Sequence, residues 1–378
     1  HIVRPVFVFG DYVLLFLKSP HFIETGIPKM TGTAGQKRVP TEYFTSSPFP
    51  LPPLAEQHRI VATVDELMGL CDRLEEARTR REAHRARLTT ASLSRLTAPD
   101  TDAQTFQTHA RFALDALPAL TSCPDQIKAL RQTILSLAVR GKLVAQEPAD
   151  EREPKLPDQS VRWAAGGKLE FEIPATWCWA RVSEVASARL GKMLDKAKNQ
   201  GSAYPYLRNT NVHWFDIRME DIKEISLADS EAADYLLQAG DVLICEGGHG
   251  IGRSAVWRGD LAPMTFQKAL HRVRPGKFLD PDFFAFCCFV YFHEGVMQAY
   301  FTGVGIPHFT GKALGRLLFP LPPLAEQHRI VAKVDELMAL CDRLEASLAT
   351  ADTTRRRLLE ALLHEALEPA DNTLAAAQ

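Results

Sequence analysis

A stretch of 26 residues occurs twice in this chain, and it constrains the fold more than any other feature of the sequence. Each copy begins Pro-Leu-Pro-Pro-Leu-Ala-Glu-Gln-His-Arg-Ile-Val-Ala, first at Pro50 and again at Pro320, an offset of 270 residues. An internal repeat of this kind predicts two copies of one structural unit. The two positions that differ are Thr63 against Lys333 and Gly69 against Ala339.

The same offset extends beyond the repeated stretch, since His1–Pro5 aligns with His271–Pro275. Residues 1 to about 100 therefore form one copy and residues 271 to about 370 the other. The first copy lacks a counterpart of Ile173–Leu270. We expect the sequence to be the C-terminal part of a longer protein, and the core of the first globular domain to be underfilled.

The composition is typical of a soluble globular protein with room for two or three domains, at 378 residues, 46% hydrophobic and 24% charged. The apolar run Val6–Leu17 is interrupted by Gly10 and Asp11 and is too short to span a bilayer. Seven scattered cysteines favour reduced thiols and a cytoplasmic location.

The charge balance argues against a nucleic-acid binder. The net charge is −2, and residues 174–275 hold 13 Lys and Arg against 12 Asp and Glu. A domain that binds DNA usually has a basic surplus, because it must neutralise phosphates. DNA binding remains open only if the cations cluster on one face or if partner proteins share the phosphate contacts.

The repeated stretch predicts two long helices. The segment Pro50-Leu-Pro-Pro53 suits a rigid entry, and a helix is expected from Leu54 to Leu96. Its apolar residues follow the 4, 3, 4, 3 spacing of a coiled coil, which predicts antiparallel pairing of the two helices. The alternative is that each helix packs on its own domain. Cys71 and Cys341 fall on this seam, so we expect core packing rather than metal binding for both. The seam residues of the first copy are Ile60, Val64, Leu67, Cys71 and Leu74.

Between the repeats, further helices are expected over residues 102–119 and from Pro124 to a cap at Gly141. Strands are predicted at Val242–Cys245 and Ser254–Trp257, and a helix at Asp282–Ala299. The predicted organisation is the end of a globular domain at 1–50, a helical region at 51–145, a linker at 146–158, a second globular domain at 159–319, a helix at 320–368 and a tail at 369–378.

The sequence shows no catalytic motif. Gly248-His-Gly-Ile-Gly252 resembles a nucleotide-binding loop, but the strand-like residues that follow it favour a hairpin loop. Gly-Lys-Ser/Thr, Gly-x-Ser-x-Gly, His-Glu-x-x-His and paired Cys-x-x-Cys motifs are absent. We therefore predict no catalytic residues and no metal site.

Globular domains with polar, glycine-rich loops, held apart by rigid helices, fit a protein that reads two spaced sites. If the ligand is duplex DNA, Arg, Lys, Asn and Gln side chains would read bases in the grooves. An ordinary loop or core role is at least as plausible for any one of them. The candidates are Arg208, Asn209, Asn211, His249, Arg253, Gln267, Lys268, His308, Thr310 and Lys312, and in the first copy Lys29, Thr31, Gln36, Lys37 and Arg38.

The repeated motif at 50–62 and 320–332 resembles the conserved-region signature of type I restriction–modification specificity subunits. Ile173–Trp179 is similar to the start of a target recognition domain, and Gly240–Ile244, Ile251–Arg253 and Gln267 are similar to its middle. The end of the family's central conserved region has a similar counterpart here in Leu130–Leu135 and Gly141–Val144. The resemblance covers nearly the whole chain.

The resemblance implies an α+β protein whose globular target recognition domains are joined by long antiparallel coiled-coil helices. Each domain would read one half of a bipartite site in double-stranded DNA, with the helices setting the gap. Such a subunit catalyses nothing and binds no cofactor itself. It recruits two methyltransferase (modification) subunits, which use S-adenosylmethionine, and restriction subunits, which use ATP and Mg. A coiled-coil scaffold for protein partners and an enzyme with an unrecognised site remain as alternatives.

Overall fold

The computed structural model describes residues 2–32, 35–98, 102–147, 150, 171–195, 199–259, 263–303, 305 and 307–367. Most of the predicted linker at 146–158 and all of the predicted tail at 369–378 lie outside these residues. The chain forms two compact units, residues 1–85 and residues 86–378. The predicted domain boundaries stay predictions.

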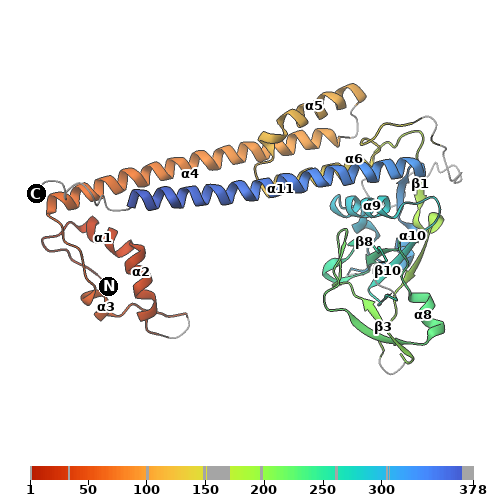
Figure 1. The fold of residues 1–378 in the computed structure, drawn as a ribbon, viewed down its shortest axis with the longest axis horizontal. Helices are drawn as coiled ribbons and strands as arrows, with labels where there is room; N and C mark the ends of the chain where they lie inside the picture. Colours follow the sequence, from red (N-terminus) through yellow and green to blue (C-terminus); the bar gives the residue numbers. More distant parts are fainter. Residues whose placement is uncertain are drawn as a thin grey trace, which may run out of the picture. The chain divides into compact units, whose positions relative to one another are not determined.

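The first unit has a small aromatic core. Its short helices are α1 (Gly10–Lys18), α2 (Pro20–Gly26), η1 (Ile27–Lys29) and α3 (Thr41–Ser46) (Figure 1). The hydroxyl of Tyr43 donates a hydrogen bond to the carbonyl of Phe22 at 2.6 Å. The apolar residues between Asp11 and Lys18 predict a short buried helix, but Tyr12 is the only buried residue of α1, so that prediction is wrong. Phe7 is 98% exposed.

The long helices follow the prediction closely. Helix α4 spans Leu54–Leu96, the predicted bounds, and α11 spans Leu324–Leu367. Directly before α11, Leu318–Leu321 form strand β11, which pairs antiparallel with β1 (Cys178–Arg181). The sequence predicted only a rigid proline entry here. Pro320 fits the strand because β11 belongs to a two-stranded sheet and has an edge that needs no donor.

Helices α5 (Ala103–Leu120) and α6 (Pro124–Val139) confirm the two predicted helices. Gly141 has φ +67° and ends α6 as predicted, and the N–H of Lys142 donates to the carbonyl of Leu137 at 3.0 Å. This is the hydrogen bond of a left-handed glycine cap.

In the second unit, the seam at the start of α11 packs against α6 and α9 (Pro281–His293), the arrangement that was weighed as the alternative to helix pairing (Figure 1). Val334 and Cys341 are each 1% exposed. Of the equivalent residues of α4, Val64 is half-buried and Cys71 is exposed, so core packing was predicted correctly for Cys341 and wrongly for Cys71. Pairing of the two long helices with each other stays a prediction.

An antiparallel sheet in the order β2-β10-β7-β8 organises the second unit, formed by Ala186–Leu190, Leu270–Pro275, Val242–Cys245 and Ser254–Val256. Strand β7 is buried on both faces: Val242 and Ile244 belong to the core that contains α9, whereas Leu243 and Cys245 belong to a second apolar cluster. Burial on both faces explains why β7 reads as one continuous apolar run.

The second apolar cluster lies against a three-stranded sheet in the order β6-β3-β9 and the short hairpin β4–β5. The predicted helix at 282–299 ends early, at His293, because Gly295 adopts φ +79° and a 3₁₀ turn follows. The remaining elements are α7 (Val182–Val185), β3 (Ser202–Leu207), β4 (Val212–His213), β5 (Asp216–Ile217), β6 (Lys223–Leu227), α8 (Asp229–Tyr235), η2 (Gly248–Gly250), β9 (Thr265–Phe266), η3 (Met297–Tyr300) and α10 (Gly311–Arg316).

Candidate nucleic-acid interface

Four loops of the second unit meet at the end of β7. The N–H of Glu246 donates to the carbonyl of Ala269 at 2.9 Å, and the N–H of Phe309 donates to the carbonyl of Glu246 at 2.7 Å. The thiol of Cys245 donates to the carbonyl of Asn209 at 3.7 Å. The fold therefore brings together candidate DNA-contacting residues that lie up to about 100 residues apart in the sequence. The loops are Arg208–Asn211, Glu246–Arg253, Gln267–Leu270 and Thr302–Thr310.

The glycine-rich loop connects β7 to β8, which confirms the predicted hairpin loop. Gly252 has φ +81°, and a Cβ there would lie 2.7 Å from the sulphur of Met297. Gly247 packs against His308, whose Nδ1 would be 3.1 Å from a Cβ. These glycines let the backbone of one loop approach its neighbours closely, which fixes where Arg253 emerges.

Residues 267–270 form a tight turn, in which the N–H of Leu270 donates to the carbonyl of Gln267 at 3.1 Å. Ala269 occupies the left-handed region at φ +91°, which costs a residue with a Cβ about 1–2 kcal/mol. Lys268 is exposed at the tip, whereas Gln267 is half-buried. The turn therefore offers Lys268, and Gln267 less fully, to a ligand.

The loop Thr302–Thr310 is closed by two backbone hydrogen bonds between Thr302 and His308, of 2.9 and 2.7 Å. His308 is exposed at this closure. The hydroxyl of Thr310 accepts a hydrogen bond from the N–H of Ala313 at 3.3 Å, so it caps α10. Lys312 is exposed in the first turn of that helix.

Two candidates have structural roles. Asn211 is 3% exposed; its side-chain oxygen accepts from the N–H of Arg208, and its amide donates to the carbonyls of Arg218 and Glu220. The guanidinium of Arg208 donates to the carboxylate of Asp221 at 2.7 Å. Asn211 thus holds its loop together, and we remove it from the set of candidate DNA contacts.

Ion pairs within the fold neutralise much of the charge in this domain. Among the described residues 171–323, Arg253, Lys268 and Lys312 have no ion pair, and Lys223, Arg272, Lys277 and Arg316 likewise have none. Three of these seven unpaired cations therefore lie in or beside the four loops. The paired arginines are Arg181 with Glu184, Arg189 with Asp234, Arg208 with Asp221, Arg218 with Asp216, Arg258 with Asp282 and Arg274 with Asp241.

Glu246 lies where the loops meet, and sequence reasoning missed it. It is half-buried, and its carboxylate has no hydrogen-bond partner in the described part of the chain. The sequence feature that could have identified Glu246 is an acidic residue directly after a buried strand and directly before Gly-Gly. A carboxylate in this place can accept a hydrogen bond from the amino group of cytosine.

His271 lies beneath the loops and is 1% exposed. Its Nε2 is 2.8 Å from the carbonyl of Phe309. Burial lowers the pKa of His271, which keeps the ring neutral at pH 7 with Nε2 as the donor. Burial also raises the pKa of the neighbouring Cys245 thiol to about 12, so that thiol is not a nucleophile.

The first unit carries a comparable loop. Thr31 and Arg38 exchange backbone hydrogen bonds of 3.0 and 2.8 Å, much as Thr302 and His308 do. Lys29 lies over the ring of Tyr43 at 5.1 Å from its centroid. Thr31, Gln36, Lys37 and Arg38 are all exposed. The side chain of His249 lies outside the described residues, and Asn209 is half-buried beside Gly248.

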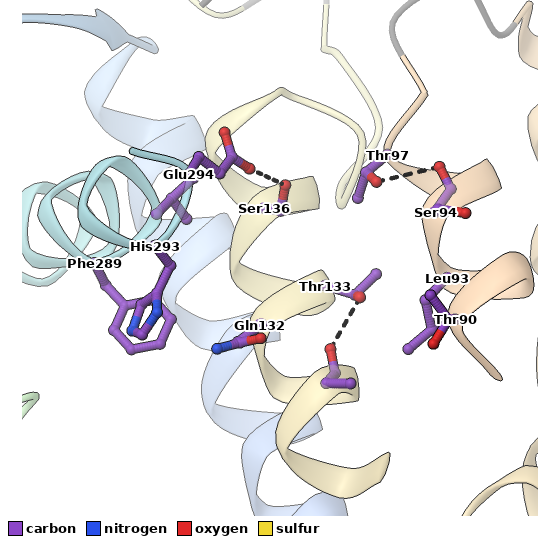
Figure 2. Close-up of a pocket in the computed structure, with 12 residues that line it drawn as sticks. Thr90, Leu93, Ser94, Thr97, Gln132, Thr133, Ser136, Phe289, His293 and Glu294 are labelled. Atoms are coloured by element: carbon purple, nitrogen blue, oxygen red, sulfur yellow. Dashed lines mark hydrogen bonds between the residues drawn. The ribbon is translucent and has the colours of Figure 1, made fainter. Parts of the chain in front are cut away.

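A hollow of about 280 Å³ lies between the end of α4, α6 and α9 (Figure 2). Glu294 on its wall accepts from the hydroxyl of Ser136 at 3.0 Å and from both terminal nitrogens of Arg140 at 2.9 Å. Burial lowers the pKa of His293, and the charge of Lys128 lowers it further. The carboxylate that accepts from Ser136 is thus held in an ion pair with Arg140.

No group of three or more His, Cys, Asp or Glu side chains is arranged to hold a metal ion within the described ranges. Likewise, none of the helices that the structure describes combines the length and hydropathy needed to cross a membrane.

The comparisons with known proteins agree on one family. A model of the type I restriction modification DNA specificity domain matches residues 174–350, a range that holds all four loops. The EcoAI specificity subunit of Escherichia coli is 31% identical over 97% of this chain, and the EcoEI specificity subunit of the same species is 29% identical over 97%. The chain spans 66% of the length of each relative. A chain from a solved type I R-M system matches the fold with a TM-score of 0.53 at 20% identity, over 95% of this chain and 71% of that one.

Proposed function

This chain belongs to the family of type I restriction–modification specificity subunits, and we propose that it recognises a bipartite sequence in double-stranded DNA. The position of Arg253 and Lys268 on tied loops, with Lys312 beside them in the first turn of α10, inside the range that matches a DNA specificity domain, carries this proposal. Lysine and arginine on loops can neutralise phosphates and read guanine edges in the major groove.

In this proposal, the first unit recognises the second half-site. Its closed loop at Thr31–Arg38 presents Gln36, Lys37 and Arg38 to solvent, in the same register of the repeat as the loop at Thr302–His308. Two similar loops on two copies of one unit suit a split site with a fixed gap. The long helices would set that gap.

We further propose that the chain is not itself an enzyme. It would act with two methyltransferase subunits and with restriction subunits, and S-adenosylmethionine, ATP and Mg would be used by those partners. Sharing phosphate contacts with partners would also compensate for a net charge of −2. We expect the complex in the cytoplasm, where its DNA substrate lies.

The test is a map of methylated adenines in cells that express this chain with its methyltransferase subunit, against cells that lack only this chain. A split motif with a fixed gap, present only with this chain, is the expected result. A charge-removal variant, Arg253→Ala with Lys268→Ala and Lys312→Ala, should abolish methylation of that motif while the methyltransferase still co-purifies. The ion-paired Arg218→Ala serves as control. Loss of co-purification with no motif under any condition would favour the scaffold function instead.

A further inference from the structure

The internal repeat sets two nearly identical helix faces in different surroundings. On α11, residues 324–345 are covered by α6 and the segment that follows it. On α4, the matching residues 54–75 differ at two positions only and are largely open. Leu67 and Leu74 are 55% and 61% exposed, whereas Leu337 and Leu344 pack against the core.

Polar contacts show how the α11 face holds its occupant. Near one end, Nη2 of Arg131 in α6 lies 2.5 Å from Asp342 and 2.9 Å from Glu345. Near the other end, the amide of Gln146 donates to the carboxylate of Glu326 at 2.6 Å. Arg329 pairs there with Asp150 at 2.7 Å. These contacts extend from Glu326 to Glu345, which is about 20 residues of helix, or about 30 Å.

The α4 face has each of these anchors without an occupant. Asp72 and Glu75 match Asp342 and Glu345, and they line a hollow of about 600 Å³. Glu56 matches Glu326, which is fully buried on α11, but Glu56 itself is exposed. In the described part of the chain, neither Asp72 nor Glu75 has an ion pair.

We propose that the α4 face from Glu56 to Glu75 is a docking surface for a partner helix of the α6 pattern. The partner would carry aliphatic residues along one side and an arginine at the place of Arg131. A glutamine and acidic residues would follow its C-terminal end, as Gln146 and Asp150 follow α6. Identical side chains at identical spacing present the same shape and charge. The contacts that hold α6 on α11 would therefore also hold a helix similar to α6 on α4.

The test uses the full chain and a labelled peptide of residues 122–150, which contains α6. Binding is measured by fluorescence anisotropy, and the site is identified by alkylation of Cys71, which is exposed, against Cys341, which is buried. We expect the peptide to bind and to protect Cys71. Asp72→Arg with Glu75→Arg should weaken binding about tenfold or more, since two attractive contacts become repulsive.

A charge exchange separates lost contact from a damaged fold. The peptide with Arg131→Glu should recover affinity for the Asp72→Arg, Glu75→Arg chain and lose it for the unchanged chain. Glu66→Arg is the control, because its counterpart Glu336 is 61% exposed and pairs with Lys333 on its own helix. It should leave binding unchanged.

Three outcomes would overturn the proposal. A peptide that fails to bind the unchanged chain removes the docking surface. Equal binding to the charge-reversed chain shows that the peptide displaces α6 from α11. Protection of Cys71 without peptide shows that the chain already covers this face, either alone or, if protection grows with concentration, through a second copy.

Discussion

Gln327 should be one of the most sensitive single positions in the second unit. Its side chain lies in the first turn of α11 and is fully buried. Its oxygen accepts from the N–H of Asp280 at 2.8 Å, and its amide donates to the carbonyls of Phe278 and Pro322, each at 2.9 Å. One side chain thereby fastens the loop before α9 to the entry of α11.

Gln327→Ala leaves one buried N–H and two carbonyls without a partner, and it opens a cavity. Each unsatisfied buried group costs about 1–3 kcal/mol, so we expect a loss of about 3–5 kcal/mol in the free energy of unfolding. Gln327→Glu should be at least as damaging, because a carboxylate cannot donate to the two carbonyls.

The repeat supplies a matched control. Gln57 is 1% exposed and makes two such bonds, to the N–H of Phe9 and the carbonyl of Pro52, both at 2.8 Å. All five tryptophans of the chain lie in residues 86–378, so tryptophan fluorescence reports the second unit alone. In urea unfolding, Gln57→Ala should shift this signal by less than about 0.5 kcal/mol.

The reasoning fails if both alanine variants shift the tryptophan transition equally. It also fails if Gln327→Ala costs less than about 1 kcal/mol, the typical net value of a single hydrogen bond. Either result would mean that water or a shifted backbone satisfies the groups that Gln327 now holds.

Three further predictions concern the loops. Gly252→Ala should cost about 2–4 kcal/mol in urea unfolding, against about 1–2 for Gly240→Ala, which also has positive φ but no atom within 4 Å of its Cβ. His271 has a lowered folded pKa, so its stabilising contribution is present above the usual 6.5 and is lost as the pH falls, by up to about 1.4 kcal/mol per pH unit; His271→Gln should flatten that loss below about pH 6.5. If Arg253 reads a base, Arg253→Ala should weaken specific DNA binding by about 1–3 kcal/mol and relax the sequence preference. If Arg253 contacts a phosphate, the variant should instead lower by about 0.9 the slope of the logarithm of the binding constant against the logarithm of the salt concentration. Arg218→Ala should change neither the affinity nor this slope.

The sequence predicted those elements whose signal is local. The bounds of α4 and β7 follow from helical spacing and from a continuous apolar run, both visible within one segment. Strand β11 was missed because its hydrogen-bond partner, β1, lies about 140 residues earlier in the chain. Nothing within Leu318–Leu321 distinguishes a paired strand from an extended entry to a helix.

The two copies of the repeat show why burial could not be predicted from sequence. Glu56 and Glu326 have the same neighbours along the chain, yet only Glu326 is buried. Burial raises the pKa of Glu326, against the opposing effect of the hydrogen bond from Gln146. Gln146 belongs to a segment outside the repeat, so the difference lies in what packs against the helix.

The candidate site shows the same limit. Asn211 and Thr310 were singled out because amides and hydroxyls can contact bases, but the same groups also satisfy loop and helix-end hydrogen bonds. Which use prevails depends on the fold: Asn211 bonds three backbone groups, and Thr310 caps a helix. Residue type selects a set of polar candidates, and only geometry separates those that are already occupied.

The near-neutral charge of the second unit has the same explanation. A formal count weighs every carboxylate equally, but many in this domain belong to ion pairs inside the fold. Asp241, at 1% exposure, is held by both Nε and Nη2 of Arg274 at 2.7 Å and contributes little field outside. Once such pairs are set aside, the cations left near the loops are Arg253, Lys268 and Lys312. A domain can thus have balanced charge overall and still present a basic surface where its loops meet, so the balance that argued against DNA binding does not exclude it.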